Sequence, residues 1–292
     1  MTFWAGPVAI GQRLPNDSPM STPRVPHAHL VQLDIAWEDK PANYARVRSL
    51  LARAEVCAGD LVVLPELFDT GFSFNLGRTV DADGATLRFI AALASELRAT
   101  IHGSRTVLGP DNRGRNRASI AGPDGGIICE YDKVHPFTFG KEAEHFSGGE
   151  RVETYSWMPE GPASVAAPAV VCPAICYDLR FPELFRIGLL KGAEVFALGA
   201  NWPAPRKLHR SALSIARAIE NQAFVLSVNR AGRDPTLIYA GGTMAVSPRG
   251  EVIGELDERE GVLSVPVDVA SVREWRAAFP AWKDHRLIGR TE

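Results

Sequence analysis

The chain has 292 residues, of which 46% are hydrophobic and 23% charged, and its formal net charge is −2 at pH 7. This composition is typical of a soluble globular protein, and the near-balanced charge argues against nucleic acid or an anionic membrane as the main partner. No apolar run is long enough to span a membrane, and the first residues lack the features of a signal peptide, so we predict a cytoplasmic protein.

Cysteine usage and the N-terminal composition limit the organisation further. The cysteines are few for this length, and Cys172 and Cys176 have no histidine pair nearby, so we expect neither a disulfide framework nor a bound metal. Residues 1–27 combine several prolines with Asn, Ser and Gly, which predicts a loosely ordered tail. No internal repeat or long linker follows, so we predict a single domain over residues 28–292.

Hydrophobic periodicity predicts two strands and two helices in the first part of this domain. The strands are predicted at 28–35 and 61–64, and the helices at 41–56 and 84–99. The strand at 61–64 is entirely apolar, and Glu66 follows it among aromatic residues. Such surroundings would raise the pKa of the Glu66 carboxyl and suit a general base, although most glutamates lie at helix starts or on the surface.

Three strands and a polar loop are predicted next. The strands lie at 101–109, 115–121 and 127–131, with a hairpin turn at 123–126 between the last two. Lys133 follows the third strand, where it is either a functional cation or a surface lysine with a buried stem. The loop at 138–150 is rich in polar groups, and loops of this kind often line pockets.

A strand, a turn and a helix surround Cys176. Strands are predicted at 152–157 and 164–175, a polar turn follows Cys176, and Pro182 begins a helix at 182–191. This arrangement can expose a nucleophilic thiol at a strand end, and the next backbone N–H can face a developing oxyanion. The alternative is a small buried hydrophobic residue, which is the commonest state of a free cysteine.

The rest of the chain continues the mixture of strands and helices. After a buried strand at 195–198 comes a polar and aromatic loop that contains Asn201, Trp202 and Arg206. We predict a helix at 207–222 and strands at 223–229, 238–247, 251–256 and 261–267, with a hairpin turn at 248–250. The aromatic segment 272–286 is expected to dock, for example on a second subunit. This order predicts an α/β protein with mixed sheets and helices outside them.

Glu66, Lys133 and Cys176 each follow a predicted strand, and ligands of open α/β sheets bind at that edge. A thiolate can attack a carbonyl or nitrile carbon, while a carboxylate takes the thiol proton and later activates water. An ammonium group raises the thiolate fraction and stabilises the oxyanion. His135 and His145 have no recognisable cysteine-protease context, and His135 is as readily explained as a supporting group.

Three stretches resemble, in the same order, the three motifs of the nitrilase superfamily of carbon–nitrogen hydrolases. They are residues 65–68, 131–137 and 175–183. The resemblance covers about residues 28–286. Within that superfamily, the chain is most similar to the ω-amidase branch, which hydrolyses amides such as 2-oxoglutaramate. The similarity lies in the stretches 201–206, 216–224, 227–230 and 272–282.

The resemblance implies a four-layer αββα sandwich and a homodimer packed through helices. It also implies site roles: Glu66 as general base, Lys133 as stabiliser of the intermediate and Cys176 as the acylated nucleophile. The backbone N–H of Tyr177 would share the oxyanion with Lys133. A second glutamate is expected to place the substrate; Glu142 aligns best, and Glu144 stays open because this loop departs from the usual family form.

The resulting hypothesis is a cofactor-free amidohydrolase that cleaves a small carboxylate-bearing amide through a cysteine thioester. We expect Glu142, Asn201, Trp202 and Arg206 to contact the substrate, and Arg180 is a further candidate for its carboxylate or a structural ion-pair partner. Hydrolysis of a nitrile, an N-carbamoyl amine or a deaminated-glutathione-type amide would use the same three residues. A non-enzymatic alternative is a catalytically silent assembly module of the same fold.

Overall fold

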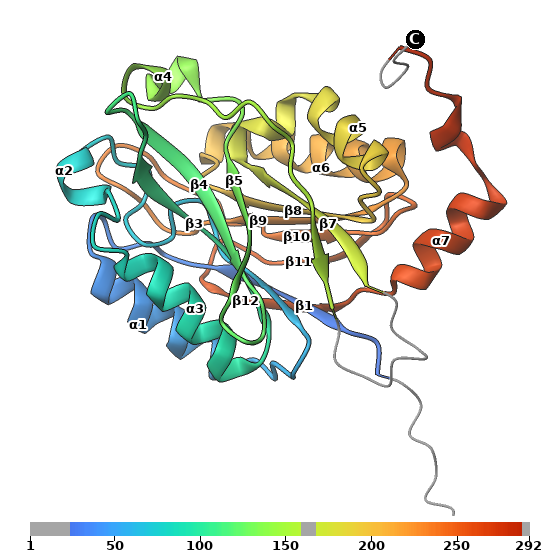
Figure 1. Ribbon diagram of the computed structural model, residues 1–292, viewed down its shortest axis with the longest axis horizontal. Coiled ribbons are helices and arrows are strands. Elements are labelled where there is room, and N and C mark those ends of the chain that lie inside the picture. Colours follow the sequence, from blue (N-terminus) through green and yellow to red (C-terminus); the bar gives the residue numbers. More distant parts are fainter. Residues whose placement is uncertain (1–23, 159–167, 288–292) are drawn as a thin grey trace, which may run out of the picture.

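Two six-stranded sheets form the centre of the protein (Figure 1). The computed structural model describes residues 24–158 and 168–287, so the predicted tail over residues 1–23 and the predicted strand residues 164–167 lie outside the described part. Within that part, no helix has the length and apolar character needed to cross a membrane.

The first sheet is a mixed sheet with the strand order β12-β1-β2-β3-β4-β5. Its strands are β1 (His27–Gln32), β2 (Leu61–Val63), β3 (Thr100–Leu108), β4 (Gly114–Ala121), β5 (Ile127–Asp132) and β12 (Gly261–Pro266). Strands β1, β2 and β3 are parallel, whereas β12, β4 and β5 run antiparallel to their neighbours. The parallel strands therefore deliver their carboxyl ends to one edge, which lies beside the residues that follow β5.

The second sheet repeats this plan with the order β11-β10-β9-β8-β7-β6. Its strands are β6 (Tyr155–Trp157), β7 (Ala169–Ile175), β8 (Val195–Ala200), β9 (Phe224–Asn229), β10 (Met244–Val246) and β11 (Val252–Glu255). Strands β7, β8 and β9 are parallel and almost completely buried, which explains their near-continuous apolar sequences.

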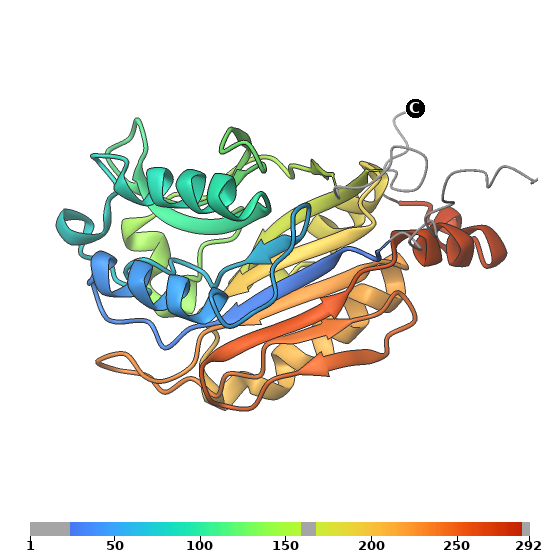
Figure 2. The ribbon, with the colours of Figure 1, turned by 90° about the horizontal axis from the view of Figure 1, so that it is seen from below.

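Helices cover the outer face of each sheet, so the predicted αββα sandwich is confirmed (Figure 2). Helices α1 (Lys40–Leu51) and α3 (Ala85–Leu97) cover the first sheet, and α5 (Pro182–Leu190) and α6 (Lys207–Asn221) cover the second. Helix α3 buries Phe89, Ile90, Leu93 and Ala94 on one face, as its periodicity predicted. Two short helices, α2 (Leu76–Thr79) and α4 (Glu142–His145), lie in loops near the strand ends.

Most predicted elements agree with the structure within two residues, and the exceptions have local causes. The strand predicted at 28–35 ends at Gln32 because Leu33 turns away and accepts a hydrogen bond from the backbone N–H of Ala231. The helix predicted at 41–56 ends at Leu51 because the chain must turn back into β2.

The prediction of a long strand at 238–247 was wrong, since only β10 forms there. The carboxylate of Asp234 accepts hydrogen bonds from the backbone N–H groups of Thr236 and Leu237 and from the Tyr239 hydroxyl. These bonds hold a compact loop that competes with strand pairing. The strand predicted at 152–157 is also shorter, because β6 begins at Tyr155.

The C-terminal segment lies at one side of the sandwich (Figure 1). It contains α7 (Val269–Ala278), in which Arg276 donates to the backbone carbonyls of Ala193, Asn221 and Gln222. The segment thus docks on its own chain at the end of α6, while Phe279 remains 54% exposed. Its predicted contact with a second subunit stays a prediction.

Candidate active site

Segments far apart in the sequence bring Glu66, Lys133 and Cys176 together. Glu66 follows β2, Lys133 follows β5, and Cys176 follows β7 of the other sheet. The Nζ atom of Lys133 lies 2.8 Å from Oε1 of Glu66, and both charges act on the Cys176 thiol. The two facing sheets therefore supply the carboxylate and ammonium from one side and the sulfur from the other.

A second glutamate shares the same lysine. Lys133 Nζ also lies 2.8 Å from Oε2 of Glu142, and all three side chains are at most 2% exposed. Burial lowers the pKa of the Lys133 ammonium, but the charges of Glu142 and Glu66 outweigh that effect and raise it above its ordinary value. Lys133 is therefore a permanent cation. Glu144 is exposed, so only Glu142 of the two candidate glutamates lies in this cluster.

The surroundings of Glu66 differ from the aromatic environment predicted for it. Its Oε2 atom accepts the backbone N–H of Asn201 at 2.9 Å, and its backbone carbonyl accepts Nδ2 of Asn201 at 2.6 Å. Oε1 accepts Nδ2 of Asn116 at 2.8 Å in addition to Lys133. The carboxylate is thus held by polar donors from three segments, an arrangement that fixes its orientation.

Cys176 sits on a sharp turn between β7 and α5. Its φ angle is +46°, a left-handed conformation that a non-glycine residue adopts only when its surroundings impose it. Asp178 imposes it: this buried carboxylate accepts the Ile175 backbone N–H at 2.9 Å and the Tyr131 hydroxyl at 2.7 Å. It also accepts the backbone N–H of His135, which makes His135 a supporting residue of the turn.

Burial and then the charge of Glu66 raise the pKa of the Cys176 thiol, while Lys133 lowers it to a smaller extent. The thiol is therefore protonated at neutral pH, and its attack on a carbon atom requires a base that takes the proton. Glu66 is the carboxylate positioned to do so.

A small cavity opens at Cys176. Its volume is about 40 Å³, which suits a small reacting group beside the sulfur. Aromatic and polar side chains line it together with the thiol: Phe72, Phe137, Tyr177, Arg180, Asn201, Trp202, Pro203, Arg206, Leu237 and Tyr239. The predicted substrate contacts Asn201, Trp202 and Arg206 are all among them.

Two guanidinium groups stand at this cavity on aromatic rings. Arg206 lies over Phe137 at 5.4 Å, and Arg180 lies over Trp202 at 4.9 Å from the ring centroid. Among the described residues, no carboxylate lies within ion-pair distance of either group. The predicted alternative role of Arg180 as a structural ion-pair partner is therefore not seen in this part of the chain. Arg180 also lies 3.3 Å from Nδ1 of His209, and both cations can meet an anionic group of a ligand.

Comparison with known proteins identifies the family of this chain. The family model of the carbon–nitrogen hydrolases matches residues 28–277. The chain belongs to the carbon–nitrogen hydrolase family. It is 35% identical over 261 residues to the omega-amidase YafV of Escherichia coli K12, covering 87% of this chain and 94% of that protein. It is 33% identical over 258 residues to the 2-oxoglutaramate amidase of Bacillus subtilis 168, covering 88% and 96%.

Solved structures of the family confirm the fold. The protein XC1258 from Xanthomonas campestris, a CN-hydrolase solved with an arsenic adduct in its active site, superposes with a TM-score of 0.81 at 33% identity. That match covers 90% of this chain and 98% of XC1258. Nit3 of Saccharomyces cerevisiae, a nitrilase-superfamily member, gives a TM-score of 0.76 at 26% identity over 89% and 96% of the two chains. The protein is thus an amidase of the carbon–nitrogen hydrolase family.

Sequence reasoning missed Asn116 and Asp178 as site residues. Asp178 belongs to the motif at 175–183, and its place two residues after Cys176 is a usable signal for a turn-holding carboxylate. Asn116 is the third residue of β4 and lies between two arginines, with no local sign of a functional role. No group of three or more metal-ligating side chains is assembled within residues 24–158 and 168–287.

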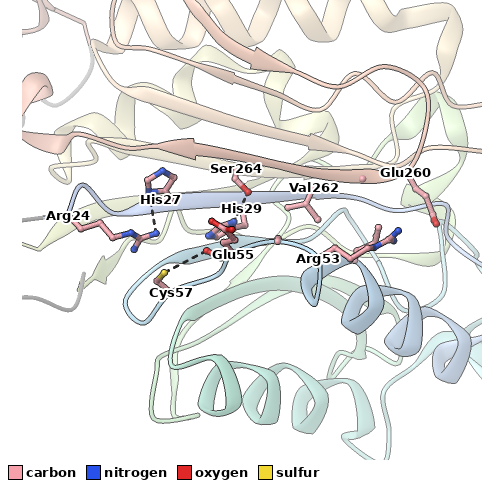
Figure 3. Close-up of a pocket in the computed structure, with 12 residues that line it drawn as sticks. Arg24, His27, His29, Arg53, Glu55, Cys57, Glu260, Val262 and Ser264 are labelled. Atoms are coloured by element: carbon pink, nitrogen blue, oxygen red, sulfur yellow. Dashed lines mark hydrogen bonds between the residues drawn. The ribbon is translucent and has the colours of Figure 1, made fainter.

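A second, larger cavity lies away from this carbon–nitrogen hydrolase site, beside β1 and β12 (Figure 3). Its volume is about 610 Å³. His29 on its wall contacts Ser264 at 2.8 Å and the buried Asp60 at 3.0 Å. Asp60 also binds Arg24 and the backbone N–H groups of His27 and Cys57, so its oxygens are shared among structural donors. This hydroxyl–imidazole–carboxylate chain connects β12, β1 and the residue directly before β2.

Proposed function

We propose that the protein is a thiol-dependent ω-amidase that hydrolyses a small carboxylate-bearing amide, such as 2-oxoglutaramate, to the acid and ammonia. The observation that carries the proposal is the buried Cys176 thiol beside the Glu66–Lys133 pair, with two guanidinium groups at the same cavity that have no carboxylate partner among the described residues. The relatives named omega-amidase and 2-oxoglutaramate amidase support the choice of substrate class.

In the proposed reaction, the sulfur of Cys176 attacks the amide carbon and its proton passes to Glu66. The carbonyl oxygen becomes an oxyanion that Lys133 and the backbone N–H of Tyr177 stabilise. Glu66 returns the proton to the leaving nitrogen, so ammonia departs and a thioester remains. Water then gives a proton to Glu66 and attacks the thioester carbon, which releases the acid and restores the thiol.

The remaining site residues take positioning roles in this proposal. Glu142 holds Lys133 through a second carboxylate contact and helps to keep the ammonium in place for the oxyanion. Asn201 and Trp202 form the wall of the cavity, and Asn201 also orients Glu66. Arg206 receives the substrate carboxylate, with Arg180 as the neighbouring cation. No metal or cofactor takes part in any of these steps.

The substrate test uses a panel that separates the alternatives. Wild-type protein is assayed on 2-oxoglutaramate, on a neutral amide of equal length, on a nitrile, on an N-carbamoyl amine and on a deaminated-glutathione-type amide. Preference for the carboxylate-bearing amide is expected; preference for a nitrile or a carbamoyl amine would overturn the substrate choice. Arg206→Ala should raise KM for the anionic amide on the order of tenfold to a hundredfold and leave the neutral amide unaffected, with Arg53→Ala as the control.

The catalytic test is Cys176→Ala, for which we expect no turnover on any member of the panel. Mass spectrometry of a wild-type reaction stopped in acid should find the acyl group on Cys176. Undiminished turnover by the variant, or an acyl group on another residue, would remove Cys176 from the mechanism. A wild-type protein whose Cys176 does not react with iodoacetamide would instead favour the assembly module.

We also propose a homodimer that packs through α5 and α6. Apolar side chains are exposed on both helices: Leu208 at 76% and Ile219 at 53% on α6, and Leu190 at 37% on α5. Light scattering at micromolar concentration should give twice the chain mass, and a monomer there would refute the assembly. The cytoplasmic location and the single domain over residues 28–292 stay predictions from the sequence.

A further inference from the structure

Asn116 completes a closed ring of hydrogen bonds with the three charged residues of the site. Its side-chain Nδ2 lies 2.8 Å from Oε1 of Glu66 and 3.3 Å from Oε1 of Glu142. Lys133 donates to the same oxygen of Glu66, Oε1, and to the other oxygen of Glu142, Oε2. The two glutamates are therefore joined twice, once by the ammonium and once by the amide group of Asn116.

The orientation of the Asn116 amide follows from chemistry. Ionised carboxylates only accept hydrogen bonds, so the –NH₂ group and not the carbonyl oxygen must face Glu66 and Glu142. Each amide hydrogen serves one carboxylate. The side chain is 2% exposed, and water therefore cannot replace these two donors.

Two carboxylates that share one cation repel each other, and this repulsion favours proton uptake by one of them. Burial raises the pKa of Glu142, and the charge of Glu66 acts in the same direction, whereas Lys133 opposes both. Hydrogen bonds donated to the charged form stabilise that form. Asn116 supplies such bonds to both carboxylates without adding a charge that would compete with Lys133 for the oxyanion.

We propose that Asn116 is a positioning residue, which orients Glu66 toward Cys176 by donating one amide hydrogen to Glu66 and the other to Glu142. The inference rests on the proposed function because it gives Glu66 the role of base. It goes beyond that function by assigning the orientation of the base to a neutral side chain of β4. The titratable groups that act on Glu66 are Lys133, Glu142, Cys176 and Tyr239.

The test compares Asn116→Leu, which keeps the approximate shape and removes both donors, with Asn116→Asp, which adds a third carboxylate. The acidic limb of the kcat/KM profile should move up by about one pH unit in Asn116→Leu and further in Asn116→Asp. At the wild-type optimum, kcat should fall on the order of tenfold to a hundredfold while KM changes little. Ser119→Ala is the matched control, because Ser119 is buried on the same strand but bonds to Arg105 and Glu130.

A second readout needs no substrate turnover: the pH dependence of Cys176 alkylation by iodoacetamide, measured on the same proteins. Its profile should shift with the Asn116 variants and not with the control. If the wild type hydrolyses no amide but the alkylation profile shifts, the proposed function fails and the role of Asn116 stands. If folded Asn116→Leu and Asn116→Asp show unshifted profiles in both assays, the role of Asn116 is wrong. Failure of both variants to fold would mark Asn116 as a folding residue and overturn it as well.

Discussion

Replacing Lys133 by methionine would leave two buried carboxylates without their shared cation. Methionine keeps the apolar stem of the lysine side chain, so the change removes mainly the charge. Glu66 and Glu142 are at most 1% exposed and cannot turn to solvent without opening the site. The variant can relieve their repulsion by binding one proton, and this limits how much stability it loses.

The size of the loss follows from the cost of that proton. A free glutamate carboxyl has a pKa of 4.5, so holding it protonated at pH 7 costs about 3 kcal/mol, at about 1.4 kcal/mol for each pH unit. At pH 5 the same proton costs about 1 kcal/mol or less. Lys133→Met should therefore lose about 3 kcal/mol of unfolding free energy at pH 7 and about 1 kcal/mol at pH 5, relative to wild type.

The sign of this pH dependence is fixed by proton binding. The folded variant keeps a proton that the unfolded chain releases above pH 4.5, so its pKa is raised on folding and its stability decreases as the pH rises. Urea melts at both pH values and at one protein concentration measure the difference. The exposed Lys141, replaced by methionine, is the control, and Lys133→Met combined with Glu142→Gln should recover most of the loss at pH 7.

A deficit that is equal at pH 5 and pH 7 would refute this reasoning, because it would show that no proton is taken up. The conclusion would then be that Glu66 and Glu142 do not share Lys133 in solution. A double variant as unstable as the single one would lead to the same conclusion by a different route. Loss of turnover alone would not discriminate, since every structural role of Lys133 predicts it.

Three further changes test other parts of the structure. Gly199→Ala places a Cβ atom 2.7 Å from the Leu64 carbonyl oxygen and 3.0 Å from the Glu66 backbone nitrogen. We therefore expect an unfolding free energy about 1–3 kcal/mol lower in urea melts, and a reduced kcat. Unchanged values would contradict the close contact between the sheets. Burial, the largest effect, raises the pKa of Asp69 to about 6, so its folded form holds more protons than the unfolded chain between about pH 4 and 6. The unfolding free energy of Asp69→Asn, measured in urea melts, should therefore rise relative to that of wild type by at most about 3 kcal/mol as the pH rises through that window. A difference between the two proteins that does not change with pH would argue against the raised pKa. Tyr131→Phe removes the 2.7 Å hydrogen bond to Asp178 and should lower the unfolding free energy by about 1.5–3 kcal/mol. It should also alter the rate of Cys176 alkylation. Unchanged values would show that other contacts alone hold the turn.

The sequence could identify the three central residues because each one follows an apolar run that is easily read as a strand. The stretch before Cys176 shows this well: β7 is nearly all apolar, and Pro182 then starts α5 as its position predicts. That Glu66 and Lys133 face each other depends on the parallel pairing of β2 with β3 and on the hairpin of β4 and β5. Periodicity contains no information on this pairing, so the contact was suggested only by the common position at strand ends and by the family resemblance.

The choice between Glu142 and Glu144 shows a different limit. Both residues lie in α4, a single turn, and they differ by only two positions. The turn is set by Lys141, whose φ angle is +63°, and by the hydrogen bond from the Phe137 backbone N–H to Oε2 of Glu142. A left-handed lysine has no sequence signature, because lysine is not a residue that favours this conformation. The direction of each glutamate was therefore not predictable from the residues alone.

The electrostatics of the site favour a thiol that loses its proton only when it meets an electrophilic carbon. With Glu66 and Glu142 facing one Lys133, the cluster carries a net negative charge, and that charge together with burial keeps the Cys176 proton in place. In the proposed mechanism the thiolate forms only as the carbonyl carbon arrives, because the new oxyanion then attracts Lys133 and Glu66 can accept the proton. A site with one glutamate fewer would stabilise the resting thiolate and expose it to oxidation. The second carboxylate, and the Asn116 amide that allows it to stay ionised, thus connect the reactivity of the sulfur to the presence of an amide.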